Sequence, residues 1–192
     1  MRFRTICRPQ QRSILAVLPA PPQTPPPPFK LCLNRQEGED VGTSFVRQGL
    51  VRDETVMPVA PGDAQEKLLA LLSHQGINVE KARQQNQLHL SLGTESPQTM
   101  ATVIAQTIAA ASGPFRLFGD RAWVKERDWS FGAIRELEDM AQAALSADGR
   151  LFLCQYPLDR FSGQEAMMAV ETHGHTFSKG LLRESPYRSS AN

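Results

Sequence analysis

Hydrophobic and polar positions follow two different periods from about Phe29 onward. Short apolar runs predict strands at 30–33, 55–59, 88–92, 115–118 and 151–156, with one or two more between 175 and 182. Longer stretches with one apolar face predict helices at 41–50, 63–75, 78–84, 96–111, 131–145 and 162–172. Strands separated by helices of this length indicate a mainly parallel sheet covered on both faces. The predicted fold class is therefore a three-layer α/β domain.

Polar residues mark where several of these elements begin or end. Asn78, Ser96 and Ser162 stand where a helix cap would accept a hydrogen bond from the first helical turn. Glu165, three residues after Ser162, completes the pattern of a capping box. Pro58 lies inside the predicted second strand and cannot donate to a ladder, which indicates an edge strand or one that ends early.

The start of the chain differs in composition from the rest. Residues 19–28 are rich in prolines, which fix φ and favour an extended chain without hydrogen bonds. We therefore expect a disordered Pro-rich tail over 1–28, one domain over 29–188 and a short disordered tail over 189–192. A docking peptide for an SH3-type groove is the alternative interpretation of the prolines.

Charge and cysteine content exclude several functions. Lys and Arg total 21 and Asp and Glu total 20, so the formal net charge of the 192 residues is +1. This balance offers no concentrated basic face for nucleic acid or an anionic membrane. Cys7, Cys32 and Cys154 are odd in number and widely spaced, which argues against a disulfide framework. We predict a reducing, cytoplasmic location, and no apolar run approaches the ~20 residues of a membrane span.

Ligands of parallel sheets bind beyond the carboxyl ends of the strands, so we expect ligand-binding residues in the segment that follows each strand. Residues 35–44 follow the first strand, where a phosphate-binding loop would lie, and Thr43 and Ser44 could contact a metal there. The glycine spacing and the lysine of such a loop are missing, and three acidic residues would repel a triphosphate. The segment therefore argues against nucleotide hydrolysis.

Asp120 and Trp123 follow the predicted strand at 115–118. An acidic residue at this end of a strand can hold a metal or a polar ligand, and a tryptophan can wall an apolar pocket. The alternative is that Asp120 caps a turn while Trp123 belongs to the core.

Cys154 and Tyr156 lie on one face of the strand at 151–156, because side chains alternate along a strand. With His173 and His175, Cys154 would make a soft ligand set for zinc or copper. A buried cysteine is also a common small core residue, and histidines at a helix end also cap carbonyl groups. Both interpretations stay open on these residues alone.

Several motifs occur in an order found in one known family. Cys154-Gln155-Tyr156, Arg160-Phe161, Thr172-His173 and 184–187 resemble the "CQYD", "RF", "THP" and "ENPYY" stretches of the MEDS family, the methanogen/methylotroph sensory domain of DcmR-like regulators. Residues 45–54, 76–79 and 119–123 are similar to its "F…GL..GE", "GIDV" and "GE..W" segments. The resemblance spans nearly all of 29–188. Residues 29–34 lack the family's histidine and aromatic residue in register, and Gly174 replaces its proline.

The resemblance implies a fold like that of the KaiC and RecA ATPases, without a functional phosphate loop. It also implies a non-enzymatic sensor of small molecules, such as simple hydrocarbon derivatives. The residues it carries over as ligand-binding are Asp120, Trp123, Cys154, Tyr156 and His173, and local geometry adds His175. We expect no cofactor, no contact with nucleic acid or membrane, and an output through a signalling kinase or transcription regulator in trans.

Two alternatives to this function remain. One is a degenerate relative of the KaiC and RecA ATPases that still binds nucleotide. The other is a metal-dependent enzyme that uses Cys154, His173 and His175.

Overall fold

The computed structural model describes residues 28–32, 35–145, 149–178 and 181–185. Apart from Pro28, the two predicted tails at 1–28 and 189–192 lie outside these residues. Everything below concerns the described residues.

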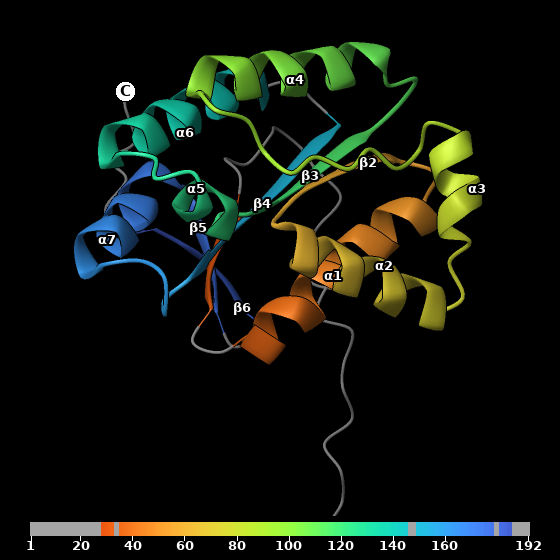
Figure 1. Ribbon diagram of the computed structural model, residues 1–192, viewed down its shortest axis with the longest axis horizontal. Helices are drawn as coiled ribbons and strands as arrows, with labels where there is room; N and C mark the ends of the chain where they lie inside the picture. Colours follow the sequence, from red (N-terminus) through yellow and green to blue (C-terminus); the bar gives the residue numbers. More distant parts are fainter. Residues whose placement is uncertain (1–27, 33–34, 146–148, 179–180, 186–192) are drawn as a thin grey trace, which may run out of the picture.

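A six-stranded sheet forms the middle layer of the domain (Figure 1). Its strands, in chain order, are β1 (Pro28–Cys32), β2 (Thr55–Val59), β3 (Phe115–Asp120), β4 (Arg150–Pro157), β5 (His175–Ser178) and β6 (Leu181–Glu184). They are arranged in the order β2-β3-β4-β1-β5-β6. All neighbouring pairs are parallel except β5 and β6, which are antiparallel. The predicted α/β class and the mainly parallel sheet are confirmed.

Helices cover both faces of the sheet (Figure 1). One side carries α1 (Arg35–Val51), α2 (Gly62–His74) and α3 (Val79–Gln84). The other side carries α4 (Pro97–Ala110), α5 (Ala122–Glu126), α6 (Phe131–Leu145) and α7 (Gly163–Thr172). The predicted helices all appear, while the short helix α5 was not expected.

Strand β4 separates two hydrophobic cores. Phe152, Cys154 and Tyr156 belong to the core beneath α4, α6 and α7, whereas Leu153 belongs to the core beneath α1 and α2. This alternation is the period of a strand that is buried on both faces. It also places Gln155 on the α1 side.

The predicted helix caps are confirmed. Asn78 accepts a hydrogen bond from the backbone of Lys81 at 2.9 Å, and Ser96 accepts one from Thr99. Ser162 forms the predicted capping box with Glu165 at the start of α7. The prediction that Pro58 lies in an edge strand is also confirmed, since β2 is the end strand of the sheet order.

The prediction of a strand at 88–92 is wrong. This segment runs beside β2 but forms only isolated bridges, Leu88 with Val56 and Ser91 with Val59. Pro58 lies between those two positions of β2 and has no N–H to donate, so a continuous ladder cannot form there.

Residues 35–44, where a phosphate-binding loop would lie, belong instead to α1, which begins at Arg35, six residues before the predicted helix start. Glu37 lies in the first turn, where a negative charge favours the helix dipole, and Gln36 bonds to Asp40 one turn later. Gly42 permits close packing on the sheet, because a Cβ there would lie 2.5 Å from the ring of Phe118.

Among the described residues, none of the helices combines the length and the apolar character that a membrane crossing requires.

Candidate functional site

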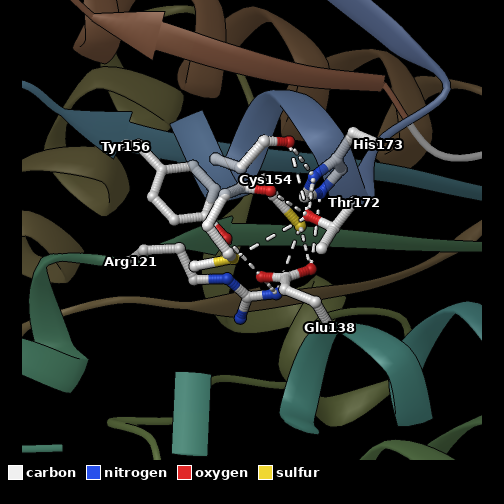
Figure 2. A network of polar contacts seen from close by, with 8 residues as sticks. Arg121, Glu138, Cys154, Tyr156, Thr172 and His173 are labelled. Atoms are coloured by element: carbon white, nitrogen blue, oxygen red, sulfur yellow. Dashed lines mark hydrogen bonds and ion pairs between the residues drawn. The ribbon is translucent and has the colours of Figure 1, made fainter. Parts of the chain in front are cut away.

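A cluster of ionisable side chains lies buried between the sheet and the helices of the α6 side (Figure 2). Its members come from the turn after β3, from α6, from β4 and from the end of α7. They are Arg121, Glu138, Cys154, Tyr156 and His173, none more than 5% exposed. Because buried charges are costly unless they are paired, their mutual contacts decide what the cluster can do.

Local structure brings these side chains together. Cys154 and Tyr156 share one face of β4, and Glu138 lies on the buried stripe of α6 that packs against that face. Gly119, at the end of β3, leaves room for the guanidinium of Arg121, because a Cβ there would lie 3.3 Å from Nη1. The cluster therefore depends on the ends of several elements rather than on one motif.

The carboxylate of Glu138 is the centre of the cluster (Figure 2). Its Oε1 lies 2.7 Å from Nη2 of Arg121 and accepts a hydrogen bond from the Tyr156 hydroxyl at 2.6 Å. Its Oε2 lies 3.3 Å from Nε2 of His173 and 3.7 Å from Sγ of Cys154. The two oxygens thus have separate roles: one holds Arg121 and Tyr156, and the other faces the imidazole and the thiol.

His173 has a fixed orientation. Its Nδ1 lies 2.8 Å from the carbonyl oxygen of Ala169 and 3.1 Å from the hydroxyl of Thr172. Because a carbonyl only accepts, Nδ1 carries the proton in that bond and Nε2 is directed toward Glu138. The ring cannot turn without giving up this bond.

Mutual attraction outweighs burial in setting the charges of the cluster. Burial alone raises the pKa of Glu138, but the charges of Arg121 and His173 bring that pKa down to about 2. Burial alone lowers the pKa of His173, but the Glu138 carboxylate, with hydrogen bonding to Cys154, raises that pKa to about 10. Burial and the same carboxylate raise the pKa of Tyr156, so its hydroxyl keeps its proton. At neutral pH Arg121 and His173 therefore carry positive charges and Glu138 carries a negative charge.

A second polar location lies on the opposite face of β4, at the carboxyl edge of the sheet. Asp120 and Gln155 are direct cross-strand neighbours there, and they line a cavity of about 30 Å³ beneath α1 and α2. The other lining residues come from both helices, from β3 and from the residue after β2; they are Gly38, Glu39, Gly42, Thr43, Ala60, Ala64, Lys67, Leu68, Leu71 and Phe118. Oε1 of Gln155 is buried and has no hydrogen-bond partner among the described residues.

The six residues predicted as ligand-binding do not lie in one place. Cys154, Tyr156 and His173 meet in the buried cluster, whereas Asp120 lines the cavity on the other side of β4. Trp123 is fully buried, and its ring lies 4.9 Å from that of Trp129 in an edge-to-face contact. His175 begins β5 and is half-buried. Their role in binding a ligand stays a prediction.

Sequence reasoning missed Arg121 and Glu138. Glu138 follows Leu137 on the inward stripe of a strongly amphipathic helix, and a charge on an apolar face was the available signal. Arg121 directly follows Asp120, which was already a candidate. A buried acid and a buried base at the edge of one core require each other, which the sequence does not reveal without the fold.

The cluster contains one possible set of metal ligands. Sγ of Cys154, a ring nitrogen of His173 and a carboxylate oxygen of Glu138 all lie within 4.8 Å of one another. An open groove of about 410 Å³ between α6 and α7 passes close to this set, because Thr172 lines the groove and also contacts the His173 ring.

Residues 34–174 match the family model described as MEDS, the methanogen/methylotroph, DcmR sensory domain. The match includes the whole buried cluster and both Asp120 and Gln155, and it ends one residue before His175. It confirms the predicted family. No curated protein matches the chain.

Proposed function

Because the chain belongs to the MEDS family of sensory domains, we propose that it is a non-enzymatic sensor that binds a small molecule at the carboxyl edge of its sheet. The occupied state would be read by a signalling kinase or a transcription regulator acting in trans. The ligand would enter the cavity between α1, α2 and the ends of β3 and β4.

The observation that carries this proposal is the buried, unpaired Oε1 of Gln155. A buried acceptor without a partner costs about 1–3 kcal/mol, and native structures contain few such groups. A ligand that donates a hydrogen bond would remove this cost. The carboxylate of Asp120, next to Gln155 across the strands, supplies a second acceptor, so the cavity favours a ligand that donates.

The position of the cavity supports the same proposal. After β1 the chain crosses toward β2 through α1, and after β4 it crosses toward β5 through α7 on the other face. Adjacent parallel strands whose connections leave in opposite directions form a switch point, and ligands of open α/β sheets bind beside it. Gln155 lies near the end of β4 at this point.

The size of the cavity connects binding with a change of shape. About 30 Å³ accommodates a water molecule or a group of similar size. A larger ligand must separate the first turns of α1 from α2, whose contact includes the ion pair between Glu39 and Lys67 at 2.5 Å. A ligand that binds the open arrangement better shifts the protein toward it, which gives a partner something to detect.

A thermal-shift and calorimetric screen tests the proposal with named probes: small alcohols, alkylamines, halogenated methanes and ATP with Mg²⁺. We expect stabilisation by a small hydrogen-bond donor and loss of that response in Gln155→Leu. Gln75→Leu, at an exposed position, is the matched control and should respond like the wild type.

Two results would count against the proposal. An unchanged response of Gln155→Leu to a genuine ligand would show that the ligand binds elsewhere. Stabilisation by ATP with Mg²⁺ alone would favour the nucleotide-binding alternative.

A further inference from the structure

Three side chains of different chemistry converge inside the buried cluster. Glu138, Cys154 and His173 come from α6, β4 and the end of α7, and their potential ligand atoms lie within 4.8 Å of one another. We propose that these three residues form a binding site for a divalent transition-metal ion, with Zn²⁺ as the ion whose preferences they match. A thiolate, an imidazole and a carboxylate are the three ligand types that zinc takes from proteins.

The distances already resemble those of a coordinated ion. Tetrahedral zinc with bonds of about 2.0–2.3 Å places a nitrogen and an oxygen ligand about 3.4 Å apart, and a sulfur and an oxygen ligand about 3.6 Å apart. Nε2 of His173 lies 3.3 Å from Oε2 of Glu138, and Sγ of Cys154 lies 3.7 Å from the same oxygen. Two of the three ligand pairs therefore already have the spacing that a coordinated ion would give them.

The groups around the three ligands hold them as metal sites usually require. Metal-bound histidines commonly donate their other ring N–H to a carbonyl or a carboxylate, and Nδ1 of His173 is bonded to the carbonyl of Ala169 at 2.8 Å. Arg121 and Tyr156 contact Oε1 of Glu138, which leaves Oε2 for the ion. The Tyr156 hydroxyl donates to Oε1 at 2.6 Å and so helps to fix the orientation of the carboxylate.

Arg121 lies close to the site, with Nη2 3.2 Å from Sγ of Cys154. A guanidinium there does not exclude the ion, because N–H groups can donate to a metal-bound thiolate. An ion would bind the thiolate form of Cys154 and the neutral imidazole of His173, so its affinity should rise with pH.

This site differs from both earlier candidates. It includes Glu138 instead of His175, and it lies on the face of β4 opposite Gln155. The groove between α6 and α7 lies near this site, since Thr172 lines the groove and contacts the ring of His173. The two proposals rest on different residues, so either can fail alone.

Co²⁺ and Zn²⁺ added to the reduced, EDTA-treated full chain test the proposal. We expect one Co²⁺ per chain, with a thiolate-to-cobalt charge-transfer band and the intense visible bands of tetrahedral Co²⁺, both abolished by one equivalent of Zn²⁺. X-ray absorption of the zinc form should show one sulfur at about 2.3 Å and nitrogen or oxygen for the remaining ligands. Neither measurement requires a variant to fold.

Variants identify the ligands. Cys154→Ala should remove the charge-transfer band, and Tyr156→Phe should weaken binding about 10- to 100-fold, as expected when a group that orients a ligand is lost. His175→Ala and the double variant Cys7→Ser/Cys32→Ser are controls that should bind like the wild type. A band that survives in Cys154→Ala, or a wild-type chain that binds no Co²⁺ through sulfur, would overturn the proposal.

Discussion

Replacing Glu138 by glutamine tests whether the buried cluster exists in solution as described. The amide has nearly the same shape as the carboxylate but carries no charge. Arg121 and His173 would then be left buried without the negative charge that lies 2.7 Å and 3.3 Å from them. The Tyr156 hydroxyl could still donate to the amide oxygen, so the loss of stability would be mainly electrostatic.

The expected loss of stability is large. Removing one partner of a buried ion pair typically costs about 3–5 kcal/mol, because the remaining charge is uncompensated. For a domain of this size, each kcal/mol lowers Tm by roughly 2–4 °C, so Glu138→Gln should lower Tm by about 6–20 °C. Urea unfolding followed by circular dichroism, with EDTA present, measures the free-energy difference directly.

The pH dependence gives a second, independent measurement. The lowered pKa of Glu138, about 2 against an ordinary 4.5, contributes stability that is fully present above pH 4.5 and is lost as the pH falls toward 2. The raised pKa of His173, about 10 against 6.5, contributes stability that is present below pH 6.5 and is lost as the pH rises through 10. The wild type should therefore gain most from the cluster between pH 4.5 and 6.5, and Glu138→Gln should lack both slopes.

Glu136→Gln is the matched control, because Glu136 lies on the same helix but is exposed and bonds only the side chain of Gln98 among the contacts described. Its effect should stay within about 0.5 kcal/mol. A loss below about 1 kcal/mol for Glu138→Gln, or equal losses in the two variants, would refute the claim that Glu138 is buried between two charged partners.

Three further changes test other parts of the fold by the same urea assay. Gly93→Ala should destabilise by about 1–3 kcal/mol, because Gly93 has φ +83° and a Cβ there would lie 2.2 Å from the ring of Trp123; an unaffected variant would contradict this close contact. Arg116→Met should cost about 3–5 kcal/mol, since it leaves the carboxylate of Glu54 without its buried partner, and the loss should shrink when Glu54→Gln is added. Ser162→Ala should cost about 0.5–2 kcal/mol through the lost cap of α7, and no change would mean that the capping box does not form.

The sequence was sufficient to predict elements that are determined by neighbouring residues. Caps at Asn78, Ser96 and Ser162 and the apolar run of β4 depend on neighbouring residues, and the structure confirms them. The segment 88–92 has the alternation of a strand, but whether it pairs depends on Pro58 in a neighbour thirty residues away in the chain. Pattern alone does not contain that information.

In the candidate site, too, the sequence predicted what depends on neighbouring residues and missed what depends on contacts between distant elements. Alternation correctly placed Cys154 and Tyr156 on one face, and the end of α7 brings His173 to them. Glu138 was not among the predicted site residues, because its partners Arg121 and His173 lie on other elements. A buried charge is explained only by the opposite charge that pairs with it, and this pairing depends on the tertiary structure.

One backbone hydrogen bond connects a residue of the proposed ligand cavity with a residue of the buried cluster. Gln155 lines the cavity, and its carbonyl accepts a hydrogen bond from the backbone N–H of Arg121 at 2.9 Å. The side chain of Arg121 in turn contacts Cys154 and Glu138 on the opposite face. A ligand that shifts the backbone of Gln155 would act through this bond on Arg121, which adjoins the proposed metal ligands. Coupling between two sites is reciprocal, so an ion in the cluster would alter the affinity of the cavity by the same factor by which the ligand alters the affinity for the ion.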